Sequence, residues 1–128
     1  MPTYPNQFAR IGISDAAVLS RLSDCFSTIF FSPENNFYHQ HPTDPDAACM
    51  FDTGNNDART EGMSYGMMMC VQMNRKDLFD KLWTFSMRYM HLSSGVHQGY
   101  FAWSVQLDGK HNAEGPAPDG EEYFAMAL

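Results

Sequence analysis

The chain has 128 residues, which predicts one domain that is large enough to bury a hydrophobic core. Its formal net charge of −7 argues against nucleic acid and against an anionic membrane surface as partners, because phosphate binding requires clustered Lys and Arg. Its three cysteines lack the spacing of a zinc site or of a disulfide framework, which favours a reducing compartment.

The N-terminal residues show no basic stretch followed by an apolar one, and no apolar run reaches the length of a membrane span. We therefore predict no signal peptide, no membrane segment and a cytoplasmic location. Ser14 is the expected N-cap of a first helix, which apolar residues at helical spacing carry from 16 to about 31. Ser32 followed by Pro33 should end that helix.

The middle of the chain alternates between a polar loop and two apolar helices. Three prolines and many Asn and Asp residues predict a long loop over 32–56, with short extended pieces at 36–40 and 48–51. A second helix is expected over 61–73, and its apolar character on almost every side predicts burial on every side. A third helix is expected from 76 to about 92.

The last thirty residues predict a short strand over 99–107, a Pro-rich loop and a final helix from about Gly120. That helix reaches Leu128, an apolar residue, without a capping signal. We therefore expect a fragment of a longer protein, with a tail that folds against a partner as the alternative. The expected fold class is all-α, and its exposed core surface should favour self-association.

Two clusters resemble metal sites. His39 and His41 precede Asp44 and Asp46, but the carboxylates lie in a Pro-interrupted loop without a third histidine nearby. The methionine triplet 67–69 points in three directions on a helix, which favours a core role. We therefore predict no metal and no cofactor.

Two carboxylates are the candidates for chemistry. Glu61 begins the second predicted helix, and Asp119 begins the last one. Each has a simpler interpretation, because Glu favours the positive end of a helix dipole and Asp is a good N-cap. If both face one cleft, the charge of Asp119 would favour the protonated Glu61 that a general acid requires.

Side chains suited to sugar surround these carboxylates. Arg59 precedes Glu61 by two positions, Tyr65 follows it by one helical turn, and Trp103 lies near the Pro-rich loop. Aromatic rings stack on the apolar faces of sugars, and polar side chains bond their hydroxyls. A place in the core is the alternative for each aromatic residue.

Three ordered segments carry a family resemblance: DTGNNDARTEGMSYGMM at 52–68, GYFAW at 99–103 and GPAPDGEEYFA at 115–125. They resemble glycoside hydrolase family 8, and most closely its xylan-acting members, the xylanases and the reducing-end xylose-releasing exo-oligoxylanases. The resemblance covers about 51–128 well and the first 50 residues loosely.

The resemblance implies part of an (α/α)6 barrel and inverting hydrolysis of β-1,4-xylosidic bonds in xylan or xylooligosaccharides. Glu61 matches the general acid of the family, and Asp119 matches the carboxylate that holds the distorted sugar ring. Trp103 and Tyr65 match positions that line the cleft, and Arg59 is a neighbour that could orient the acid.

Family members are several-fold longer, and their catalytic base falls beyond Leu128 in sequence. We therefore expect residues 1–128 to be the N-terminal portion of one catalytic domain, inactive alone because it holds the acid without the base. The alternative is a non-catalytic carbohydrate-binding or interaction module.

Overall fold

A computed structural model describes residues 5–34 and 37–128. The chain divides into two compact units, Met1–Asn36 and Phe37–Leu128. The first unit holds a short 3-10 helix, Gln7–Ile11, and helix α1, Asp15–Phe31. The Ser14 hydroxyl accepts a hydrogen bond from the amide of Ala17 at 3.2 Å, which confirms the predicted N-cap.

The second unit contains a small antiparallel sheet. Its strands are β1 (Tyr38–Gln40), β2 (Ala48–Asp52), β3 (Asp57–Arg59) and β4 (Ser104–Val105), paired in that order. The prediction of an all-α chain is therefore too narrow. β1 and β2 fall on the short extended pieces that were predicted, whereas the strand predicted over 99–107 is reduced to Ser104–Val105 and β3 was not predicted.

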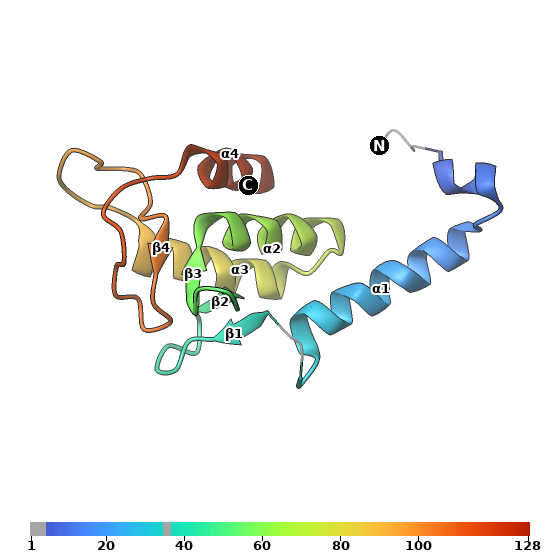
Figure 1. The fold of residues 1–128 in the computed structure, drawn as a ribbon, viewed down its shortest axis with the longest axis horizontal. Coiled ribbons are helices and arrows are strands. Elements are labelled where there is room, and N and C mark those ends of the chain that lie inside the picture. Colours follow the sequence, from blue (N-terminus) through green and yellow to red (C-terminus); the bar gives the residue numbers. More distant parts are fainter. Residues whose placement is uncertain (1–4, 35–36) are drawn as a thin grey trace. The chain divides into compact units, whose positions relative to one another are not determined.

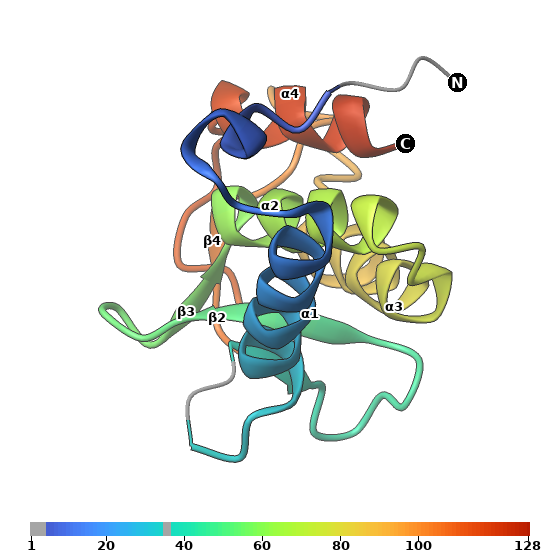
Figure 2. The same ribbon diagram turned by 90° about the vertical axis from the view of Figure 1, so that its right-hand side faces the viewer.

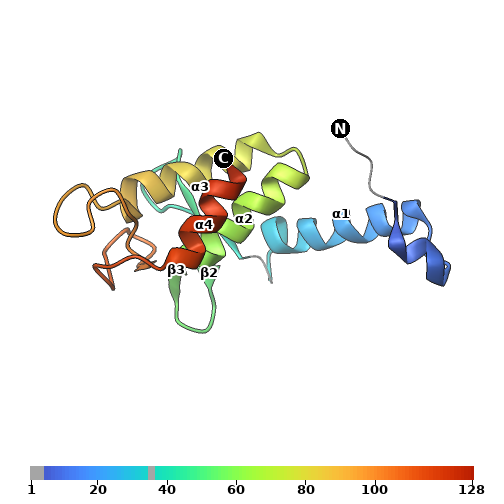
Figure 3. The ribbon, with the colours of Figure 1, turned by 90° about the horizontal axis from the view of Figure 1, so that it is seen from above.

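The second unit also contains helices: α2 (Thr60–Gln72), α3 (Lys76–Phe85), a π-helical turn (Ser86–Met90) and α4 (Pro118–Ala127). Helices α2 and α3 pack against β2, and α4 lies on the side of α2 away from the sheet (Figures 1 and 2). Seen from above, α4 crosses α2 (Figure 3). With α1, the described residues thus contain four α-helices, as predicted, although no closed barrel is present among them.

Helix α2 lies at the centre of the second unit. Met63, Met67 and Cys70 are fully buried on the faces that meet the sheet, α3 and α4. Tyr65 and Val71 are half-exposed, at 51% and 52%, so within this chain α2 is not buried on every side and carries the exposed apolar surface that was expected. The sequence showed that α2 is apolar all round but not how many neighbours cover it.

The start of α4 also differs from its prediction. The N-cap is Ala117, whose side chain makes no capping bond, and Pro118 occupies the first helical turn. Asp119 is therefore inside the first turn instead of being the cap. A carboxylate there still lies at the positive end of the helix dipole.

No helix within the described ranges is both long enough and apolar enough to cross a bilayer. The three cysteines are free thiols, with Cys49 and Cys70 buried and Cys25 partly accessible. Burial raises the pKa of Cys49 and of Cys70 to about 12.

The buried thiols should resist modification. Because the thiolate is the reactive form, a pKa of about 12 leaves about one thiol in ten thousand reactive near pH 8. We expect Ellman's reagent to label Cys25 in the native chain, and to label Cys49 and Cys70 only after guanidinium is added. Cys25→Ser is the control. Rapid labelling of native Cys25→Ser chain would contradict the burial of the other two thiols.

Candidate active site

A cavity of about 300 Å³ opens at the N-terminal end of α2. Glu61 contributes a carboxylate oxygen, Oε2, that is buried and has no hydrogen-bond partner among the described residues. A buried polar atom without a partner is costly and calls for an explanation such as a ligand. The residues that line the cavity are Met50, Phe51, Asp52, Arg59, Glu61, Gly62 and Tyr65.

The position of Glu61 follows from a direct passage from strand to helix. β3 ends at Arg59, which is extended and serves as the N-cap residue of α2. The amide of Thr60 donates to the carbonyl oxygen of Trp103 at 3.1 Å, which ties the start of α2 to the segment before β4. Glu61 therefore occupies the first turn of a helix whose starting point is fixed from two sides.

Arg59 lies beside Glu61 and is held by two carboxylates. Its Nε donates to Oδ1 of Asp57 at 3.0 Å and lies 3.2 Å from Oδ2 of Asp52. The hydrogen bond to Asp57, together with the charges of Asp57, Asp52 and Glu61, raises the pKa of Arg59. Arg59 thus stays protonated next to the candidate acid, and the carboxylates of Asp57 and Asp52 offset its charge.

Two of the predicted aromatic residues lie at this site in different ways. Tyr65 lines the cavity, and its ring meets that of Tyr123 edge-on at 5.4 Å. Trp103 is half-buried and contacts the site through Arg59, whose guanidinium carbon lies 5.1 Å from the centre of the indole ring. The Trp103 amide donates to Gly115 at 3.0 Å, which holds the ring-bearing segment in place.

Asp119 lies on the neighbouring helix. Its side chain is exposed in the first turn of α4, outside the set of residues that line the cavity. The next residue, Gly120, is packed directly on Thr60, the residue before Glu61. The structure thus brings Glu61, Arg59 and Tyr65 into one cavity, with Trp103 behind Arg59 and Asp119 on the adjoining helix end.

Two acidic residues of the site were missed at the sequence level. Asp52 lines the cavity, and Asp57 is buried beneath Arg59. A period of two places Asp57 and Arg59 on one face of a strand, and that spacing could have indicated the pair. No strand was predicted over 57–59, so this pairing was not expected.

The carboxylate of Asp52 accepts several hydrogen bonds. Its carboxylate accepts hydrogen bonds from the side chain of Asn55 at 2.9 Å and from the amide of Gly54 at 2.8 Å. These bonds, with the charge of Arg59, lower its pKa. A carboxylate stabilised in this way is a weak base.

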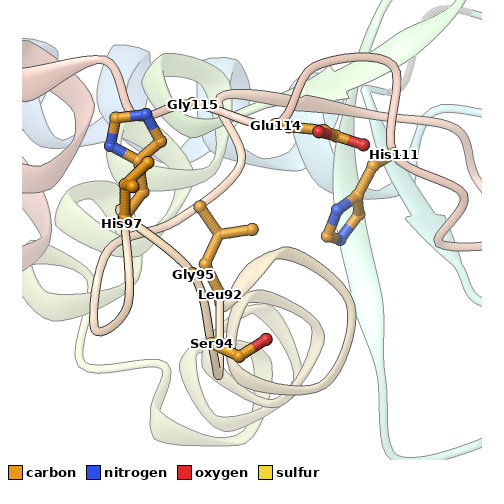
Figure 4. Close-up of a pocket in the computed structure, with 8 residues that line it drawn as sticks. Leu92, Ser94, Gly95, His97, His111, Glu114 and Gly115 are labelled. Carbon is orange, nitrogen blue, oxygen red and sulfur yellow. The ribbon is translucent and has the colours of Figure 1, made fainter.

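A second and larger cavity, of about 570 Å³, lies between the loops 92–97 and 111–115. His97 faces it from one side, and His111 and Glu114 face it from the other (Figure 4). These three side chains belong to exposed residues, and Nε2 of His111 is already 2.9 Å from the carbonyl oxygen of Tyr89. Size alone favours this cavity as the active site, whereas the buried carboxylate and the adjacent cation favour the cavity at Glu61.

The histidines of the polar loop have other contacts. His39 packs on the ring of Phe51 at 4.9 Å. Nδ1 of His41 accepts hydrogen bonds from the amides of Thr43 and Asp44, at 3.3 and 3.0 Å. Across the described part of the chain, no three His, Cys, Asp or Glu side chains are grouped to hold a metal ion.

Comparison with known proteins relates this chain to a family. The model of glycosyl hydrolases family 8 matches residues 15–128. A reducing end xylose-releasing exo-oligoxylanase of Halalkalibacterium halodurans is 52% identical over 126 residues, which cover 98% of this chain and 32% of that protein. An enzyme of the same name from Bifidobacterium adolescentis is 53% identical over 123 residues, 96% of this chain and 32% of its own length.

Solved structures of proteins with the same name also match this chain. The crystal structure of a reducing-end-xylose releasing exo-oligoxylanase superposes with a TM-score of 0.90 at 51% identity, over 97% of this chain and 32% of that one. A mutant form complexed with xylobiose gives the same TM-score and identity, over 97% and 33% of the two chains. This chain spans about a third of the length of these relatives. The chain belongs to glycosyl hydrolase family 8.

Proposed function

We propose that this chain is the N-terminal part of a catalytic domain that hydrolyses β-1,4-xylosidic bonds of xylan or xylooligosaccharides with inversion. The observation that carries the proposal is the buried, unpartnered Oε2 of Glu61 in a cavity beside a cation and aromatic rings. The relatives are named as enzymes that release xylose from the reducing end, and this supports xylose as the sugar. A cytoplasmic location stays part of the proposal.

Glu61 is the general acid in this proposal and protonates the glycosidic oxygen as the bond breaks. Arg59 and Tyr65 bind the sugar in the cavity, and Trp103 supports Arg59 from behind. Asp119 holds the ring in the central subsite from the start of α4. The exposed apolar side chains of α2 and α4, Tyr65, Val71 and Met126 among them, are covered by self-association or by further chain.

An inverting enzyme also needs a base, with the two carboxyl groups roughly 6.5–9.5 Å apart so that water fits between them. Asp52 shares the cavity with Glu61, but its hydrogen bonds and Arg59 lower its pKa and make it unsuited to accept a proton. We therefore propose that the base comes from sequence outside these residues, and that the chain alone does not turn over substrate.

A fusion tests this proposal. Leu128 is joined to the part of the Halalkalibacterium halodurans relative that follows its matching segment, and xylose release from xylotriose is measured. We expect activity from the fusion and none from the 128-residue chain. Xylose release by the chain alone would contradict the missing base. A folded fusion without activity, beside an active parent relative, would contradict the enzymatic function.

A non-catalytic carbohydrate-binding module is the second candidate. The observation that favours it is that the described cavity holds binding groups and one unpartnered carboxylate, with Asp52 already engaged. A fusion that releases no xylose but still binds xylotriose in a calorimetric titration would support this candidate.

A further inference from the structure

We propose that Asp57 and Ser104 are a positioning pair, which fixes Arg59 at the Glu61 cavity so that its remaining N–H groups face the sugar. The proposal rests on the proposed function, because it assigns Arg59 to sugar binding. Asp57 is 5% exposed and Ser104 is 2% exposed, so both polar side chains are removed from water. Neither residue lines the cavity itself.

Both oxygens of Asp57 are used. Oδ2 accepts the hydroxyl proton of Ser104 at an Oγ–Oδ2 distance of 2.6 Å, and Nε of Arg59 donates to Oδ1 at 3.0 Å and to Oδ2 at 3.3 Å. A buried carboxylate is stable only when it is paired and hydrogen-bonded, and these contacts meet that condition. The cation therefore contacts both oxygens, and the neutral hydroxyl adds a second donor to Oδ2.

Ser104 is anchored in turn. It lies opposite Arg59 in the register of β3 and β4, and its hydroxyl oxygen accepts from the side-chain amide of Asn112 at 3.1 Å. A hydroxyl has a single proton, so the bond to Asp57 and the bond from Asn112 fix its direction. A chain of three hydrogen bonds thus runs from Asn112 through Ser104 and Asp57 to Arg59.

This arrangement occupies only part of the hydrogen-bonding capacity of Arg59. A guanidinium has five N–H donors, and here the bond to Asp57 occupies the one on Nε. Among the described residues, no hydrogen bond from the two terminal nitrogens is found. Because Trp103 lies at 5.1 Å from the guanidinium carbon and restricts its movement, those nitrogens are held ready for hydroxyl oxygens of a ligand.

Asp52 provides a matched comparison. It also contacts Arg59, at 3.2 Å, but its side chain is 31% exposed against 7% for Asp57. An exposed ion pair contributes little, whereas a buried and hydrogen-bonded one constrains geometry. If the buried ion pair is what holds the Arg59 side chain in place, Asp57→Asn should release Arg59, whereas Asp52→Asn should not.

The first measurement needs no ligand. In a proton–nitrogen correlation spectrum of the 128-residue chain, the Nε–H signal of Arg59, assigned with Arg59→Lys, should carry a ring-current shift from Trp103. We expect Asp57→Asn and Ser104→Ala to broaden that signal and remove the shift. Asp52→Asn and Ser104→Thr, which keeps the hydroxyl, should retain both. Backbone signals show whether each variant is folded.

The second measurement is a titration with xylobiose, followed in the same spectra. We expect Asp57→Asn and Ser104→Ala to weaken binding about tenfold, and Ser104→Thr to stay within about twofold. If Asp57→Asn does not fold, the Ser104→Ala and Ser104→Thr pair carries the test.

Three results would overturn the positioning role. The Arg59 signal could be unchanged in Asp57→Asn, Ser104→Ala and Ser104→Thr could weaken xylobiose binding equally, or the signal could change without any effect on binding. A wild-type chain whose spectrum does not respond to xylobiose would instead count against the proposed function, since the first measurement is made without sugar.

Discussion

Glu61→Gln should reduce xylose release by the fusion about 10²–10⁴-fold, the usual contribution of general acid catalysis. Gln keeps the size of the side chain and its place in the cavity but cannot deliver a proton. Binding of xylobiose should therefore change by no more than about twofold. Initial rates of xylose release and calorimetric titration, on the same protein preparation, measure the two quantities.

The control is Glu122→Gln, which makes the same change at an exposed position of α4 and should leave both quantities unaltered. A nitrophenyl xylobioside supplies a further check, because its leaving group departs without protonation. Its hydrolysis should fall far less in Glu61→Gln than that of xylotriose. An equal fall for both substrates would show that Glu61 is not the acid.

Gly120→Ala should destabilise the chain by about 1–3 kcal/mol or more, the range found when atoms are added to a well-packed contact. An added Cβ would lie 2.4 Å from Oγ1 of Thr60 and 2.9 Å from its backbone carbonyl carbon. Backbone cannot move aside as a flexible side chain can, so α4 must separate from α2. Urea unfolding followed by circular dichroism measures the loss.

Gly62→Ala and Gly66→Ala are matched controls on α2. At Gly62 the nearest atom to an added Cβ is 3.7 Å away, so the better helix propensity of Ala should stabilise the chain by about 0.5–1 kcal/mol. At Gly66 the closest atom, at 2.5 Å, belongs to the flexible side chain of Met50, which predicts an intermediate effect. Equal stability of Gly120→Ala and Gly62→Ala would disprove the close approach of α4 to α2.

Gly120 also matters for the site. Its contact with Thr60 sets the first turn of α4, which carries Asp119, against the residue before Glu61. Gly120→Ala should therefore reduce activity of the fusion as well as stability. This coupling could not be read from the sequence, where Gly120 was only the expected start of a helix.

What could be predicted from sequence is local or motif-based. The cap at Ser14 and the span of α1 depend on neighbouring residues and a period of 3.6, and the structure confirms both. The start of α2 at Glu61 was placed within one residue for the same reason. The membership in glycosyl hydrolase family 8 came from long ordered motifs and is confirmed by the match over 15–128.

Non-local pairing decided the rest. The β1–β2 and β2–β3 pairs join neighbouring segments, but β3 meets β4 from more than forty positions away, which no short window of sequence contains. The β3–β4 pairing also buries Asp57 against Ser104, and the sequence had indicated no role for Asp57. The sequence by itself determined the helices, the family and the candidate acid. Only the tertiary structure decided which polar groups surround that acid, because hydrogen bonds between distant segments depend on how the chain folds back on itself.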